Sequence, residues 1–284
     1  MLARTSDEWY AALIALVDDV ELRKTMARAA YLDVLWHYGP ERRVEQVRSL
    51  LEQLAGGRSG ARAFQLELSR RQMSRTRGIM LPDSEVVFAA DTLGEAEVTV
   101  TIPLHNYAHF IIEALESVRA QTLTSLDLVV VDDASDDASL AVTLEWVQRH
   151  AGRFNRVAIV RNRRNAGLGV TRNAGFAAAE TPYVLPLDAD NRLRPTCCAV
   201  CLDAIRGTGA AFAYPSLQQF GDSSDVIGLE SFAPMRFVGG NYIDALALVA
   251  QSAWAAAGGY DNIIPNGWED YELWCSFVER GIID

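Results

Sequence analysis

The run LDLVVVDDASDD, residues 126–137, is an apolar stretch that ends in acidic and hydroxyl side chains. Its first half is rich in β-branched valine, which is typical of a strand buried on both faces of a parallel sheet. The carboxylates follow at the carboxyl end of that strand, which is where open parallel sheets bind their ligands. This run therefore predicts both the class of the fold and the position of its functional residues.

The same pattern of a strand and then a helix recurs on both sides of this run. The alternating elements are expected at 98–102, 108–121, 126–131, 140–150, 157–160, 170–179 and 183–187. Strands that alternate with helices of this length predict an α/β fold with a mostly parallel sheet flanked by helices.

Three of the expected strands end in polar turns. Any one turn is as well explained as the capped start of a helix, because Asp, Asn and Ser are favoured there. Three turns that meet at one edge of a sheet are better explained as one ligand-binding crevice. The turns are Pro103-Leu104-His105-Asn106-Tyr107, Asp132-Asp133-Ala134-Ser135-Asp136-Asp137 and Asp188-Ala189-Asp190-Asn191.

The Asp188-Ala189-Asp190 triplet has the chemistry of a divalent-cation site. Alternate spacing at the end of a strand places both carboxylates near one ligand, while Ala189 points away. A hard divalent ion held by carboxylate oxygens can neutralise the charge that develops on a diphosphate leaving group. Two other enzyme classes, the haloacid dehalogenase phosphatases and the sugar-nucleotide pyrophosphorylases, need a downstream lysine, and no lysine follows Lys24.

Five motifs, taken in order, resemble the family 2 glycosyltransferases of the GT-A fold, from residue 98 to about residue 275. They are the opening Pro103-Leu104-His105-Asn106, the turn 131–137, the stretch 165–175, the triplet 188–190 and Trp268-Glu269-Asp270. The resemblance implies transfer of a sugar from a nucleotide-diphosphate donor, most often UDP-linked, to a hydroxyl of a glycan or lipid-linked saccharide. It also implies an inverting displacement that depends on Mn²⁺ or Mg²⁺.

On the donor side, the resemblance assigns Pro103, His105 and Asp133 to the nucleotide base. His105 stands where Tyr or Phe is usual in the family. An imidazole still offers a flat face and a hydrogen bond to a base, and the alternative is a histidine in a surface turn. The identity of the base is therefore left open.

Around the diphosphate, the resemblance places Asp188 at the ribose and beside the metal, and Asp190 on the metal itself. The stretch that begins at Asn165 is a glycine-rich approach into a helix, which leaves backbone N–H groups free near the diphosphate. Arg172 follows in that helix. It is expected either to contact phosphate or donor sugar, or to pair with a carboxylate at the edge of the sheet.

On the acceptor side, the resemblance makes Asp270 the catalytic base that takes a proton from the acceptor hydroxyl. Glu269 is counted with it as a catalytic candidate. The alternative is that both carboxylates only complement the dipole of the helix that they open. Trp268 is expected to be either a platform for the acceptor sugar or part of the core.

Residues 1–57 are expected to form a helical region, 58–95 a linker, and 96–284 the GT-A domain, cut short at its C-terminal end. Within the first region, residues 9–54 resemble the helical tail of family 4 glycosyltransferases of the GT-B type, which implies a larger fused protein. An independent helical bundle is the alternative. The helices would be amphipathic in either case.

The net charge, the cysteines and the lengths of the apolar runs limit which partners and which compartment are expected for this protein. A net charge of −11 and a pI near 4.9 argue against a nucleic-acid partner, which needs a basic face. The four cysteines have no zinc-site spacing and are expected to be buried thiols in a reducing compartment. No run reaches the roughly 18–20 apolar residues of a membrane span, so a cytoplasmic protein is expected, with room for contact at the inner face of the membrane. A donor-binding or scaffold module without turnover is the non-enzymatic alternative.

Overall fold

The computed structural model describes residues 78–282 apart from residues 222 and 262–267. These residues belong to one compact unit that spans Arg75–Asp284. The helices expected within residues 1–57 lie outside the described residues, and so does the first part of the expected linker, 58–77.

Seven strands form the main sheet, in the order β1-β4-β3-β2-β5-β9-β6. The four in its centre run parallel to one another. They are β2 (Val98–Leu104), β3 (Leu126–Asp132), β4 (Arg156–Asn162) and β5 (Tyr183–Pro186). The predicted α/β fold with a mostly parallel sheet is confirmed.

Three further strands pair antiparallel at the two sides of this centre. β1 (Ser84–Asp91) pairs with β4, β9 (Leu248–Ala250) pairs with β5, and β6 (Phe212–Ala213) pairs with β9. β1 corrects the expected linker over 58–95, since its residues belong to the sheet. It is an edge strand with mostly exposed side chains, so the alternation of apolar and polar residues that signals a strand is weak in it.

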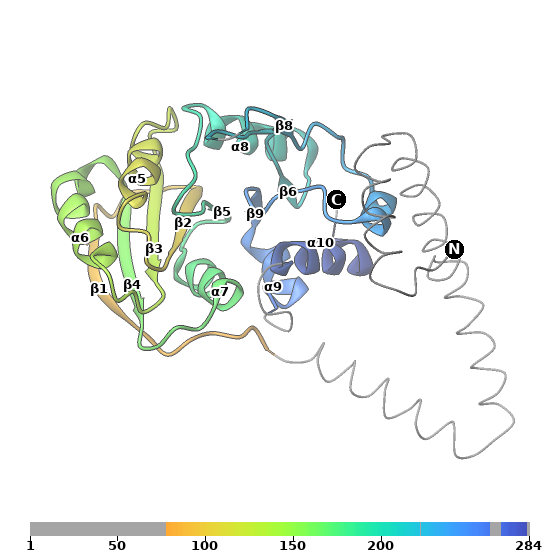
Figure 1. Cartoon of the computed structure of the whole chain (residues 1–284). Helices are drawn as coiled ribbons and strands as arrows, with labels where there is room; N and C mark the ends of the chain where they lie inside the picture. The colour runs from red at the N-terminus through yellow and green to blue at the C-terminus, as the bar shows by residue number, and fades with distance from the viewer. Residues whose placement is uncertain (1–77, 222, 262–267, 283–284) are drawn as a thin grey trace, which may run out of the picture. The chain divides into compact units, whose positions relative to one another are not determined.

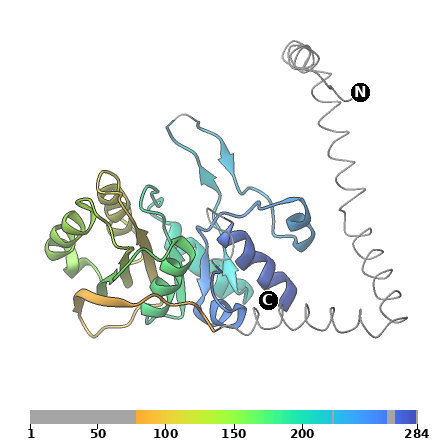
Figure 2. The same cartoon turned by 60° about the horizontal axis from the view of Figure 1, so that its bottom comes forward.

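Six α-helices, two short 3₁₀ helices and a small hairpin complete the described part of the chain. The hairpin, β7 (Leu217–Gln218) and β8 (Val226–Ile227), stands away from the main sheet (Figure 2). The helices are α5 (Ile111–Arg119), α6 (Ser139–His150), η1 (Ala151–Arg153), α7 (Leu168–Ala178), α8 (Cys197–Thr208), η2 (Pro234–Gly239), α9 (Gln251–Ala257) and α10 (Glu269–Arg280).

Side chains of β3 alternate between two cores because successive residues of a strand point to opposite faces of the sheet. Leu128 and Val130 pack in a large core with residues of α5, α6 and α8. Val129 and Val131 pack in a smaller core with α7, which covers the other face (Figure 1). Both faces are thus covered, and the carboxyl ends of the parallel strands are left free to carry polar turns.

A third, largely aromatic core joins α7 to β9, α9 and α10. Phe176 of α7 stacks on Trp254 of α9 with ring centroids 5.1 Å apart. Trp274 and Phe277 anchor α10 in the same core. This packing holds α10 against α7 and α9.

The cysteines are free thiols, as predicted, and Cys197, Cys198 and Cys201 are buried in α8. Burial raises the pKa of Cys198 to about 12, so its thiol stays protonated at neutral pH. Within residues 78–282, leaving aside the gaps named above, no helix has the length and apolar character needed to cross a membrane.

Candidate active site

The turns that follow β2 and β3 are held together by hydrogen bonds between their backbone and side chains. The Asn106 backbone N–H donates to Ser135 Oγ at 3.1 Å, and Asn106 Oδ1 accepts from the Asp136 backbone N–H at 3.0 Å. Asn106 and Ala134 both have left-handed backbones, with φ of 57° and 55°. Two of the three polar turns predicted from the sequence therefore meet at the carboxyl edge of the sheet.

Asp133 is buried at the start of the second turn, and its carboxylate is engaged within the protein. It accepts hydrogen bonds from Asn162 Nδ2 at 2.8 Å and from the backbone N–H groups of Ala166 and Gly167 at 2.8 and 3.0 Å. The loop before α7 is thus tied to the end of β3. Contact between Asp133 and the nucleotide base stays a prediction. In this structure the Asp133 carboxylate fixes the loop that precedes α7.

His105 is exposed and lies between Asp133 and Asn165. Its Nδ1 is 2.8 Å from the Asp133 carbonyl oxygen, which can only accept, so we assign the proton to Nδ1. Its Nε2 is 3.1 Å from Asn165 Nδ2, from which it accepts. Pro103, which the sequence analysis placed in the turn, is buried inside β2 opposite Val131, because β2 runs on to Leu104.

Arg172 joins the donor side of the predicted site to its acceptor side. Its side chain is only 2% exposed, and Nη2 lies 2.7 Å from Asp188 Oδ1 while Nη1 pairs with Glu269 Oε1. Burial works against the charge on Arg172, but Asp188, Tyr260 and Glu269 outweigh it, so the pKa of the guanidinium is raised. Of the two roles expected for Arg172, the structure shows the pairing with carboxylates.

Asp188 and Asp190 lie in the turn after β5, where Asn191 N–H donates to the Asp188 carbonyl at 2.9 Å. The Asp188 side chain is 34% exposed and Asp190 is exposed. Their carboxylate oxygens suit Mn²⁺ or Mg²⁺. The described residues contain no group of three or more His, Cys, Asp or Glu that could hold a metal ion.

Asp270 lies in the first turn of α10 and is half-buried. Its Oδ2 accepts from Asn241 Nδ2 at 2.9 Å. Burial and the neighbouring Glu269 raise the pKa of this carboxyl, against the opposing effects of Arg172 and Asn241. A raised pKa makes a carboxylate a stronger base, which suits the predicted role.

The family model described as Glycosyl transferase family 2 matches residues 99–256, more than half of the chain. The chain belongs to this family. The predicted family, enzyme class and GT-A fold are thereby confirmed.

Several proteins are similar to this family 2 glycosyltransferase in sequence. The chondroitin synthase of Escherichia coli is 25% identical over 189 residues, which are 65% of this chain and 27% of that protein. The succinoglycan biosynthesis protein ExoO of Rhizobium meliloti is 33% identical over 134 residues, 47% of this chain and 35% of that protein. The chain thus spans roughly a third of the length of these curated relatives.

Solved structures share the fold. Staphylococcus aureus TarS 1-349 in complex with UDP-GlcNAc has a TM-score of 0.53 and 18% identity, over 64% of this chain and 54% of that one. The mannosyltransferase PcManGT of Pyrobaculum calidifontis, in complex with GDP-Man and Mn²⁺, has a TM-score of 0.51 and 18% identity, over 79% of this chain and 61% of that one.

Two polar residues of this glycosyltransferase site were missed by the sequence analysis. Asn241 donates a hydrogen bond to Asp270. Burial and the charges of Asp188 and Glu269 raise the pKa of the Asp244 carboxyl, against the opposing effect of Arg172. Both lie in the irregular segment before β9, which has no periodic pattern. The local sequence there is GGNYID, residues 239–244, in which Asn241 and Asp244 themselves are the only amide or carboxylate side chains.

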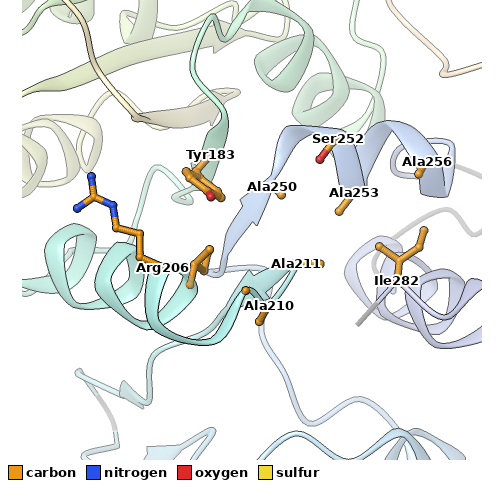
Figure 3. A pocket seen from close by; sticks show the side chains of 11 residues that line it. Tyr183, Arg206, Ala210, Ala211, Ala250, Ser252, Ala253, Ala256 and Ile282 are labelled. Carbon is orange, nitrogen blue, oxygen red and sulfur yellow. The ribbon is translucent and has the colours of Figure 1, made fainter. Parts of the chain in front are cut away.

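A hollow of about 500 Å³ lies away from these residues (Figure 3). Its lining includes Tyr183 at the start of β5, which is the opposite end of that strand from Asp188, and a group of alanines from α9 and β9. Its lining contains none of the carboxylates described above.

Proposed function

We propose that this glycosyltransferase moves a sugar from a UDP-linked donor to a hydroxyl of a glycan or lipid-linked saccharide, with inversion and with Mn²⁺ or Mg²⁺. The observation that carries the proposal is the bridge made by Arg172. It places Asp188, on the donor side, next to Glu269, whose neighbour Asp270 is the base.

The donor would lie along the carboxyl ends of β2, β3 and β5. His105 and the turn at Asp133 would receive the base. The N–H groups in the first turn of α7 would face the diphosphate, whereas those of Ala166 and Gly167 just before it are bound by Asp133. TarS with UDP-GlcNAc and PcManGT with GDP-Man share this fold, which supports a nucleotide-diphosphate donor.

Asp190, together with Asp188, would hold the metal. When bound, the ion offsets the negative charge that grows on the diphosphate as it leaves. Asp190 is exposed and free to take a ligand from solvent, whereas Asp188 is oriented by Arg172. The Mn²⁺ in the PcManGT complex supports this choice of ion.

Asp270 would remove the proton from the acceptor hydroxyl as that oxygen attacks the anomeric carbon. A bond forms between the acceptor oxygen and the anomeric carbon, and the bond to the diphosphate oxygen breaks on the opposite face. The proton passes to Asp270, the electron pair leaves with the nucleoside diphosphate, and a single displacement inverts the configuration. Asn241 keeps the Asp270 carboxylate oriented for this step.

Trp268 would form a platform for the acceptor sugar. Its side chain is 54% exposed, and its indole meets the Tyr271 ring edge-on at 5.4 Å. It also has a left-handed backbone, with φ of 74°, which is costly for a bulky residue and is found where function needs it. The exposed indole directly precedes Glu269 and the base Asp270 in the chain.

The organisation of the whole chain belongs to the same proposal. Residues 96–284 would form the catalytic domain, and residues 1–57 a separate helical region of a longer glycosyltransferase in the cytoplasm. Lipid-linked acceptors would be met at the inner face of the membrane. The chondroitin synthase and ExoO relatives, whose names refer to polysaccharide synthesis, support a glycan product.

The test is nucleotide release from UDP-sugars on addition of saccharide acceptors, in the wild type and two variants. Asp190→Ala should lose metal-dependent donor binding, whereas Asp270→Ala should keep binding and lose transfer. Asp203→Ala is the matched control, because Asp203 is an exposed aspartate on α8, outside the site. Equal loss of donor binding in the first two variants would contradict the assignment of the base.

A further inference from the structure

We propose that Arg172 is the positioning residue of this site: it holds Asp188 and Glu269 in one arrangement and so sets where Asp270 stands relative to the donor. The inference rests on the proposed function for the roles of Asp188 and Asp270. It gives Glu269 the role of an anchor, in place of the catalytic role expected from the sequence.

The contacts of Arg172 fit a residue that joins two parts of the protein better than a residue that binds the donor. Both terminal nitrogens are engaged, one with each carboxylate, and Nε is buried with no hydrogen-bond partner among the described residues. The guanidinium also lies over the Tyr260 ring, with its central carbon 5.7 Å from the ring centroid. The Arg172 side chain is only 2% exposed, so its neighbours would have to move before a phosphate could reach it. A planar guanidinium with a rigid fork of donors fixes the direction of both partners.

Helix α7, which carries Arg172, also packs closely against the residues around the start of α10 at Gly169 and Asn173. At Gly169 an added Cβ would come within 2.9 Å of the Asp261 carbonyl oxygen and 3.4 Å of Glu269 Cβ. Asn173 Oδ1 accepts from Trp254 Nε1 at 3.0 Å and from the Tyr260 backbone N–H at 2.7 Å. The first turn of α10 therefore cannot move against α7 without losing buried contacts.

Glu269 and Asp270 are held in different ways, which separates their roles. The Glu269 side chain is only 9% exposed and pairs with Arg172. Asp270 is held by Asn241 and by the backbone N–H of Tyr271, which leaves lone pairs for a proton from the acceptor. The Glu269 oxygen that accepts from Arg172 is occupied by that contact, which suits an anchor rather than a base.

The experiment compares four variants of the full chain with one matched control. Arg172→Met should lower kcat by about a hundredfold, since displacement of a reacting group by about 1 Å costs that much. Mn²⁺-dependent binding of UDP should stay within a few-fold of wild type. Arg172→Lys should recover little, because one ammonium cannot reproduce the fork. Glu269→Gln keeps an oxygen that accepts from Arg172, so this variant should keep most of the wild-type kcat. The kcat of Glu269→Ala should fall about as far as that of Arg172→Met.

Arg156→Met is the control. Arg156 also ties a strand to α7, through an ion pair with Glu180 at 3.0 Å and a hydrogen bond to the Ala178 carbonyl at 3.0 Å, but at the end of α7 away from the site. Its kcat should match wild type. A loss equal to that of Arg172→Met would show that the fall is structural and would overturn the inference.

The pH profile of kcat adds a readout that unfolding does not move. Asp270 faces Arg172 from α7, Tyr260 from the preceding turn and Glu269 from its own helix. Arg172 lowers the pKa of Asp270, so its loss should move the acid limb of the profile to higher pH. An unmoved limb, or a loss of UDP binding in step with kcat, would contradict the positioning role.

The two Glu269 variants keep the inference testable if Arg172→Met does not fold. Equal loss in Glu269→Gln and Glu269→Ala would show that the charge of Glu269 is used chemically and would overturn the anchor role. The wild-type protein separates the two proposals. If it transfers no sugar, the proposed function fails; if it transfers sugar and Arg172→Met does too at the same rate, only this inference fails.

Discussion

Replacing Gly259 by alanine should destabilise the protein far more than the same change at its neighbour Gly258. Both glycines have left-handed backbones, with φ of 93° at Gly258 and 77° at Gly259. A Cβ at Gly258 would meet no atom within 4 Å, whereas one at Gly259 would lie 2.7 Å from Asn173 Oδ1 and 3.0 Å from Ile79 Cγ2. The pair therefore separates backbone strain from steric conflict.

The magnitude follows from what Asn173 would have to give up. Its Oδ1 accepts from Trp254 and Tyr260, and its Nδ2 donates to the carbonyls of Met80 and Tyr260, so it cannot turn away freely. A left-handed alanine costs about 1–2 kcal/mol. Loss of the two bonds to Oδ1 adds about 2 kcal/mol, at about 1 kcal/mol for each bond. We expect about 1–2 kcal/mol for Gly258→Ala and about 3–4 kcal/mol for Gly259→Ala.

The assay is urea unfolding followed by tryptophan fluorescence, with the free energy of unfolding taken by linear extrapolation. Gly259→Ala should show the lower midpoint with an unchanged slope. Equal free energies for the two variants would refute the claim that Asn173 fastens the turn before α10 to α7.

Two further predictions concern the acceptor side. Trp268→Ala should raise the KM for the acceptor and leave UDP binding unchanged, because the exposed indole lies on the acceptor side; weakened UDP binding, measured by calorimetry, would contradict this. Asp270→Asn should abolish transfer yet raise the free energy of unfolding at neutral pH. Burial raises the pKa of the folded carboxyl above its unfolded value near 3.8, so the ionised carboxylate costs stability at neutral pH. The gain in Asp270→Asn should fade as the pH falls from the raised folded pKa towards 3.8 and be absent below it, in urea titrations at several pH values.

The strands of the parallel centre and their polar turns could be predicted from the sequence because their signals are local. β2 to β5 are short apolar runs, and a polar residue ends each run or follows it within two residues, so each strand can be recognised from its own sequence alone. The convergence of the turns follows from the rule that ligands bind at the carboxyl ends of parallel strands. The family then follows from the order of the motifs.

The remaining elements could not be predicted in this way because they depend on partners far along the chain. β1 is an exposed edge strand, and β6 and β9 are two and three residues long, so none carries a periodic pattern. The Arg172 bridge to Glu269 spans 97 residues of sequence. Asp133 was assigned to the base by resemblance, and only the structure shows its carboxylate bonded to the loop at Ala166 and Gly167.

The most direct test of metal-dependent sugar transfer is the melting temperature of the wild-type chain with UDP-, GDP- and dTDP-sugars, with and without Mn²⁺. A ligand that binds only the folded state raises the melting temperature. We predict that UDP-sugars do so in the presence of Mn²⁺ and that Asp190→Ala removes the effect. No rise with any of these donors, or an equal rise in Asp190→Ala, would contradict the account.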